Sequence, residues 1–314
     1  MLQLPQRARL LLRMTALVLS VLAMPRALET RHPVWLISLG ENSDAAERSR
    51  AMLREVSALF RVPGVRAGDV AAHVHGMAPD AALTTEHEAG RRGFGRIAAL
   101  VSHLAAMHAI AKHYDARISL SHDPIAIVVQ DDASLEFSQW WGRVGMRLDH
   151  FIDAAPADFQ FVQLAPVADN AVWHQLDRTP IAADPTRVLA RWASTAPAGL
   201  GCYAVRASTA QYLTRTFWRR HGEIGAPRWD ILPFLADAQR RVDLANVYPE
   251  AFLFGRAVGY VALTAPVSYH LDGSWFARGR TRDDEHAEVC ARAMLAARWR
   301  MWAATQVRGC NARS

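Results

Sequence analysis

The chain has 314 residues, a formal net charge of +6 and a sequence pI of about 9.7, and 51% of its residues are hydrophobic. This length allows one large or two small domains with a sizeable core. The three cysteines are few and far apart, which argues against a disulfide framework and favours a reducing compartment. The charge suits phosphate-rich ligands or an anionic membrane surface, although the excess of Arg over Lys also follows from GC-rich coding. The basic residues are scattered and no nucleic-acid-binding motif is visible, so nucleic acid is a minor option.

Residues 1–30 form a first segment with a basic and then an apolar part. Three arginines precede the apolar run 14–23, which is shorter than the roughly 20 residues of a transmembrane helix. Three interpretations compete: an export signal, a helix on a membrane surface, or an over-extended start of the chain.

The next 250 residues, 31–280, alternate between short apolar runs and helical patterns. A charged amphipathic helix is expected over 44–59, and a second helix has apolar residues at the spacing of one face from Ile97 to Ile110. Further helices are expected from about Ser208 and over 231–240. Strands are expected near residues 34–39, 125–130, 159–164 and 201–206. This alternation predicts an α/β fold with a mainly parallel central sheet flanked by helices.

The stretch 166–197 is rich in Pro, Ala and Asp and is the longest region without strand signals. It is interpreted either as a substrate loop or as a poorly ordered insertion. Residues 281–314 form the last segment, with an amphipathic helix expected over 283–306. That helix packs on the domain or lies at a membrane surface.

Two adjacent carboxylates, Asp131 and Asp132, follow the apolar run 125–130 directly. Ligands of open α/β sheets bind at the carboxyl ends of the strands, where this pair is expected. Adjacent carboxylates suit a hard divalent cation, which can in turn hold a diphosphate. The simpler interpretation is an ordinary turn, because Asp is common at strand ends and before helices.

The residues before this strand add a second pattern. With the acid pair, they resemble glycosyltransferase family 25, which includes lipopolysaccharide sugar transferases and collagen galactosyltransferases. Members read Gly-Glu-Ile-Gly-Cys-x-x-Ser-His, then a helix, then an apolar strand ending in Glu-Asp-Asp. The matching positions in this chain are Gly95, Ile97, Ser102, His103, Asp131 and Asp132. The departures are Arg96, Ala98, Ala99 and Gln130.

The resemblance extends loosely over residues 33–255. It includes the opening strand near 33–39, the Gly-x-x-x-Tyr strand at 199–205, and a later acidic segment at 229–232. It implies the nucleotide-sugar transferase fold called GT-A. It further implies a metal-dependent inverting glycosyltransferase that moves a hexose such as galactose from a UDP-sugar to a lipopolysaccharide or other cell-envelope glycan, including a lipid-linked one.

In that interpretation, Asp131 and Asp132 coordinate Mn²⁺ or Mg²⁺, and the cation neutralises charge on the departing UDP. Inversion needs a general base, for which Asp230 is the leading candidate. Its alternative role is to cap the helix expected over 231–240. The resemblance places Gly95, Ser102, His103 and Gln130 in the donor site; Gly95 is expected to permit a close backbone approach.

Because the UDP-sugar donor is cytoplasmic, a cytoplasmic protein is favoured over an exported one. If the ends of the chain bind a membrane, the protein would be peripheral on its inner face. Two other functions stay open. One is a degenerate relative that binds nucleotide or glycan without turnover, suggested by Arg96 and Gln130. The other is a metal-dependent phosphohydrolase, which needs further ligands such as His122 and Asp123. The pair His73 and His75, on an expected strand, and the late His270 are interpreted as ordinary histidines rather than metal ligands.

Overall fold

The computed structural model describes fourteen parts of the chain. They are residues 30–40, 53, 56, 58–77, 88–115, 123–134, 147–166, 170–178, 189–191, 199–219, 226–233, 249–254, 257–263 and 266–269. Residues 1–29 of the N-terminal segment, the expected C-terminal helix and His270 therefore lie outside the described residues.

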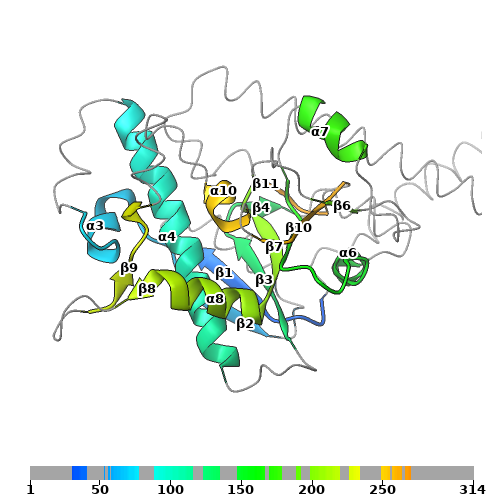
Figure 1. Cartoon of the computed structure of the whole chain (residues 1–314), viewed down its shortest axis with the longest axis horizontal. Coiled ribbons are helices and arrows are strands. Elements are labelled where there is room, and N and C mark those ends of the chain that lie inside the picture. Colours follow the sequence, from blue (N-terminus) through cyan, green and yellow to red (C-terminus); the bar gives the residue numbers. More distant parts are fainter. Residues whose placement is uncertain are drawn as a thin grey trace, which may run out of the picture.

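A seven-stranded sheet with the order β2-β1-β3-β7-β5-β10-β6 forms the centre of the protein (Figure 1). Its strands are β1 (Val34–Ser38), β2 (Leu59–Pro63), β3 (Ile125–Gln130), β5 (Phe161–Gln163), β6 (Leu189–Arg191), β7 (Cys202–Arg206) and β10 (Gly259–Ala262). β7 and β6 run against their neighbours, and the other five strands share one direction. The α/β class and the mainly parallel sheet are thus confirmed.

Helices cover both faces of this sheet. One face carries α3 (Val70–His73), α4 (Glu88–Tyr114), α8 (Ala207–Phe217) and α10 (Pro249–Phe254). The other face carries α6 (Leu148–Asp153) and α7 (Asn170–Asp177). Figure 1 shows α4 and α8 crossing beside β1 and β3, with α6 and α7 on the other side of the view.

The strands alternate between these two apolar layers. In β1, Val34 and Leu36 face the α6 and α7 layer, whereas Trp35 and Ile37 face α4. Because both faces are covered, the central strands are apolar at nearly every position, as the run 125–130 indicated.

The order β2-β1-β3 creates a reversal in the winding of the sheet. From β1 the chain moves outward to β2 and then returns through α4 to β3 on the other side of β1, with both pairings parallel. The carboxyl ends of β1 and β3 therefore flank a topological switch point, where open α/β sheets bind their ligands.

Small pieces complete the fold. They are η1 (Ala67–Asp69), the hairpin of β8 (Trp218–Arg219) with β9 (Arg228–Trp229), and the pair of β4 (Ala133–Ser134) with β11 (Ser268–Tyr269).

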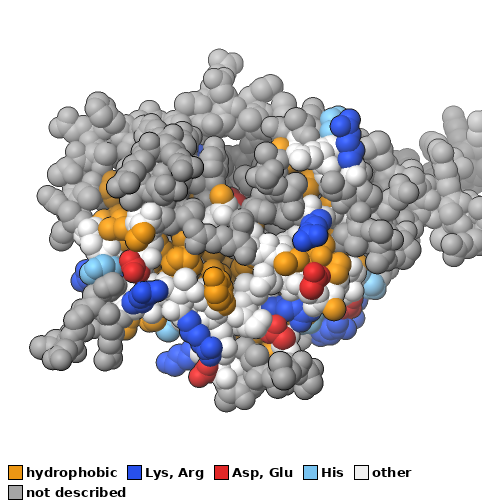
Figure 2. Space-filling model, in the orientation of Figure 1, with side chains coloured by type: hydrophobic (Ala, Val, Ile, Leu, Met, Phe, Trp, Pro, Cys, Tyr) orange, Lys and Arg blue, Asp and Glu red, His pale blue; other side chains and the backbone are white. Residues whose placement is uncertain are grey.

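On the face drawn in Figure 2, hydrophobic side chains gather over α8, where Tyr212 is 60% exposed. In the described chain, one helix, α4, has a stretch long and apolar enough to span a membrane, and 67% of that stretch is buried inside the protein.

Several expected elements agree with the structure and others do not. The helix around 97–110, the strand 125–130 and the helix from about Ser208 are confirmed as α4, β3 and α8. Leu59, expected in a helix, begins β2 instead, and most of 44–59 lies outside the described residues. His73 lies at the end of α3 rather than on a strand, and its neighbour Val74 makes only an isolated bridge.

The stretch 166–197 is not wholly irregular. It contains α7 and β6, and β6 forms an edge of the central sheet by pairing with β10. Trp173 of α7 is 2% exposed and packs in the core beside Leu176. Tertiary burial of a few apolar side chains outweighs the loop-like composition around them.

Candidate functional site

The acid pair lies where the sequence predicted it, at the carboxyl end of β3. Asp131 follows Gln130 in a turn, and its backbone N–H donates to Ile37 O at 3.1 Å. Its carboxylate accepts hydrogen bonds from the Ser38 hydroxyl and the Leu39 N–H, both at the end of β1. Asp131 therefore bridges the two strands that flank the switch point.

Burial shapes the electrostatics of this pair. Asp132 is only 3% exposed, and burial raises the pKa of the Asp131 carboxyl above its ordinary value despite the hydrogen bonds from β1. Two neighbouring carboxylates, one partly buried and one buried, make a hard, anionic donor set that a divalent cation fits. Within the described ranges, no three His, Cys, Asp or Glu side chains gather as a ready metal site. Among the described residues, any further ligands would therefore be amides or backbone oxygens, or would come from water or substrate.

Gln130, the last residue of β3, is tied to α4 and β7 through His103. The Gln130 side-chain Nε2 lies 2.9 Å from His103 Nε2, and His103 Nδ1 lies 2.9 Å from the Tyr203 hydroxyl. His103 and Tyr203 are fully buried, and burial lowers the pKa of His103 to about 3. The imidazole is therefore neutral at physiological pH, and it links Gln130 to Tyr203 as an uncharged hydrogen-bonding group.

Ser102 and Gly95, the other two predicted donor-site residues, also lie on α4. Ser102 is buried; its hydroxyl donates to Ala98 O and accepts from Val65 N–H, both at 2.8 Å, so it fastens α4 to the segment after β2. A side chain on Gly95 would meet no described atom within 4 Å. The described chain thus makes no close approach at Gly95, and the approach of a donor there stays a prediction.

The described hydrogen bond of Asp230 is to the end of α8 and does not involve the acid pair. Asp230 follows β9, and its backbone N–H donates to Phe217 O at the end of α8, at 2.7 Å. Leu232 and Pro233 after it are helical, and the rest of the expected helix lies outside the described residues. Its role as a base stays a prediction.

The sequence did not predict a pair of hydrogen bonds that hold the backbone of Gly199. Gly199 precedes β7, at the same edge of the sheet as the acid pair. Gln163 Nε2 donates to Gly199 O at 2.7 Å, and Gly199 N–H donates to Glu250 Oε1 at 2.9 Å. Gly199 has φ +114°, a conformation that favours glycine. Burial raises the pKa of Glu250, and the positive charge of Arg96 partly opposes that shift. The Gly-x-Gly spacing before a strand was the available signal; nothing in the sequence pointed to Glu250.

Asp123 lies at the opposite end of β3. Its carboxylate accepts from Ser208 N–H at 3.0 Å and from the Ser208 hydroxyl at 2.6 Å. It therefore caps α8, whose own N-cap residue, Arg206, makes no side-chain cap bond. Asp123 does not join Asp131, because about 25 Å of extended chain separates them.

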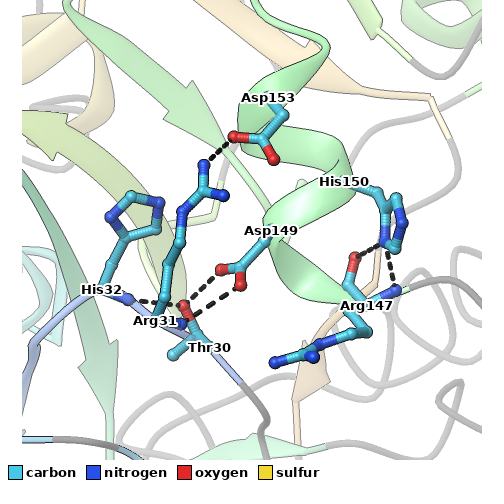
Figure 3. A network of polar contacts seen from close by, with 7 residues as sticks. All are labelled: Thr30, Arg31, His32, Arg147, Asp149, His150 and Asp153. Atoms are coloured by element: carbon cyan, nitrogen blue, oxygen red, sulfur yellow. Dashed lines mark hydrogen bonds and ion pairs between the residues drawn. The ribbon is translucent and has the colours of Figure 1, made fainter.

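A second polar cluster lies before β1 (Figure 3). The Thr30 hydroxyl donates to Asp149 at 2.6 Å, Arg31 N–H donates to the same carboxylate at 3.1 Å, and the Arg31 guanidinium pairs with Asp153. Both aspartates belong to α6. This network attaches the residues before β1 to α6, at the end of β1 opposite the acid pair.

Comparison with known proteins adds no family. No model of a protein family matches the chain, and a search of curated proteins found no match.

Proposed function

We propose that this protein is a metal-dependent inverting glycosyltransferase with a GT-A-like fold, which transfers a hexose from a UDP-sugar to a cell-envelope glycan. One observation carries the proposal. The carboxylates of Asp131 and Asp132 lie at the carboxyl end of β3, at the switch point of a mixed α/β sheet, where a nucleotide diphosphate would bind.

The chain's own residues have distinct roles in this proposal. Asp131 and Asp132 would hold Mn²⁺ or Mg²⁺, and the bound cation would neutralise the diphosphate leaving group. Ser38 and Leu39 keep the Asp131 carboxylate in place from β1. Gly95 on α4 would border the donor, since no described atom lies within 4 Å of where its side chain would be. Asp230 is the proposed base that takes the proton from the acceptor hydroxyl.

Two other functions, a metal-dependent phosphohydrolase and a degenerate relative without turnover, are weighed against the contacts of Asp123 and the identity of residue 130. A phosphohydrolase needs additional ligands near the acid pair. Of the two expected ones, Asp123 is engaged with Ser208 at the far end of β3, and His122 lies outside the described residues. A degenerate relative that binds nucleotide without turnover stays a second candidate, supported by Gln130 in place of the family's Glu. The proposed acceptor is a glycan or lipid-linked glycan. Location in the cytoplasm, or at the inner membrane surface, belongs to the same proposal.

Calorimetric titration of UDP into the purified protein, with and without Mn²⁺, tests the site. Wild type should bind UDP only with Mn²⁺, and Asp132→Ala should abolish binding without unfolding the protein. Asp153→Ala, which removes an exposed carboxylate from α6, is the matched control and should bind as wild type does. No binding by folded wild type would refute the UDP-dependent function.

Turnover separates the transferase from the degenerate relative. Release of UDP from a UDP-sugar should require both Mn²⁺ and a glycan acceptor. Asp230→Asn should keep UDP binding while transfer falls by about 10²–10⁴-fold, the usual contribution of a general base. Unchanged transfer in Asp230→Asn would remove that residue from the mechanism. Binding without any release of UDP, across a panel of sugars and acceptors, would favour the degenerate relative.

A further inference from the structure

Gln130 is held in one orientation by two buried side chains, His103 and Tyr203, which are joined to it in a chain of hydrogen bonds. Its amide nitrogen donates to His103 Nε2, so that ring nitrogen carries no proton. The neutral imidazole must then carry its proton on Nδ1, which donates to the Tyr203 hydroxyl at 2.9 Å. The side chains come from β3, α4 and β7, so the Gln130 amide is fixed by three elements of the core.

This arrangement leaves one atom of Gln130 unsatisfied. The amide oxygen, Oε1, is buried and has no hydrogen-bond partner among the described residues. A buried acceptor without a partner costs about 1–3 kcal/mol, so native proteins rarely keep one without a reason. The unsatisfied oxygen belongs to the residue directly before Asp131, at the switch point of the sheet.

We propose that Gln130 Oε1 is a further oxygen of the cation site, which accepts a hydrogen bond from water bound to the metal, and that His103 and Tyr203 position it. This inference rests on the proposed function, because it uses the cation that Asp131 and Asp132 would hold. In this proposal the Gln130 amide oxygen acts through water, so the site does not need the Glu carboxylate that glycosyltransferase family 25 has at this position.

The chemistry of the ligands favours water as the partner of this oxygen. Diphosphate oxygens are acceptors at neutral pH and would repel an amide oxygen. Mg²⁺ usually keeps several of its waters, and such waters are strong donors. Groups in the outer shell of metal sites orient the inner ligands, and removing one typically lowers metal affinity by 10–100-fold.

Titration with Mn²⁺ alone, followed by electron paramagnetic resonance of the free ion, tests the inference without nucleotide or turnover. Gln130→Met has a similar shape and no polar atoms, and should weaken Mn²⁺ binding about 10-fold. Gln130→Glu keeps an oxygen at this place and adds a charge, and His103 can hold it by carrying its proton on Nε2 instead of Nδ1. This variant should therefore bind Mn²⁺ at least as tightly as wild type. Tyr203→Phe should weaken binding in the same direction but by less, because only the partner of His103 Nδ1 is lost.

Two controls keep the result interpretable. Thr209→Val removes a buried hydroxyl of α8 that lacks a partner in the described structure, and should leave Mn²⁺ affinity unchanged. Asp131→Asn should abolish binding. Thermal unfolding of each variant confirms that it is folded.

The outcomes separate the two proposals. Wild-type Mn²⁺ affinity in folded Gln130→Met, with binding abolished in Asp131→Asn, would overturn the role of Gln130 and leave the proposed function standing. An equal loss in Thr209→Val would also overturn it, because the loss would then reflect general destabilisation. Failure of wild type to bind Mn²⁺, with or without UDP, would refute the proposed function itself.

Discussion

Asp123→Ala offers a test of how this fold assigns roles to its acidic residues. Asp123 accepts two hydrogen bonds from Ser208, 3.0 Å to the backbone nitrogen and 2.6 Å to the hydroxyl, at the first turn of α8. Loss of a helix cap costs about 0.5–2 kcal/mol, and loss of a negative charge at a helix N-terminus adds about 0.3–1 kcal/mol. We expect a total of about 1–2 kcal/mol, because the two contributions overlap.

In a chain of 314 residues, that loss should lower the melting temperature by about 1.5–3 °C. Circular dichroism during thermal unfolding measures the shift. Asp123→Asn keeps an acceptor oxygen for the Ser208 N–H and should lose about half as much. Calorimetry on the same variants should give the wild-type affinity for UDP with Mn²⁺, since Asp123 and Asp131 lie at opposite ends of β3.

Two results would contradict this reasoning. An unchanged melting temperature would mean that Asp123 does not cap α8. Loss of Mn²⁺-dependent UDP binding in folded Asp123→Ala would place Asp123 in the metal site and revive the phosphohydrolase.

Three further predictions concern other parts of the fold. Ser102→Ala leaves the Val65 N–H without its partner and should cost about 1–3 kcal/mol in urea unfolding; a loss of UDP affinity at unchanged stability would instead place the hydroxyl in the donor site. Burial raises the pKa of the Glu250 carboxyl in the folded protein. The stability that its protonated form contributes is therefore complete below the ordinary carboxyl pKa, and it is lost as the pH rises through the raised pKa. Glu250→Gln keeps an acceptor for Gly199 and should therefore melt higher than wild type at pH 7–8, with the difference vanishing towards about pH 4; an equal difference at all pH values would contradict this. Trp173→Ala should cost about 3–5 kcal/mol by urea unfolding, because the side chain is 2% exposed; a cost below 1 kcal/mol would mean that α7 does not pack on the sheet.

Local patterns predicted the parts of this fold that carry their own periodicity. The run 125–130 is apolar at nearly every position, as a strand covered on both faces must be, and it coincides with β3. The residues from Ile97 to Ile110 repeat at helical spacing and lie in α4, the longest helix of the described chain. The change from apolar residues to Asp131 marked the end of the strand, and hence the edge of the sheet where the candidate site lies.

Other elements carry too little local signal. β2 and β6 have only five and three residues, and each exists because a neighbouring strand supplies its hydrogen-bond partners. α7 lies in a stretch rich in Pro, Ala and Asp, and its place depends on the burial of Trp173 and Leu176. Composition describes a segment alone, whereas these elements are stabilised by what they pack against.

The sequence by itself determined the α/β class, the central strand β3, helix α4 and the position of Asp131 and Asp132 at a strand end, because hydrophobic periodicity acts over a few neighbouring residues. Only the tertiary structure decided which polar groups meet. It joined Gln130 to His103 and Tyr203, 27 and 73 positions away, engaged Ser102 with Val65, and turned Asp123 to the cap of α8. These contacts cross between strands and helices far apart in the chain, and their partners are set by the winding of the sheet rather than by sequence spacing.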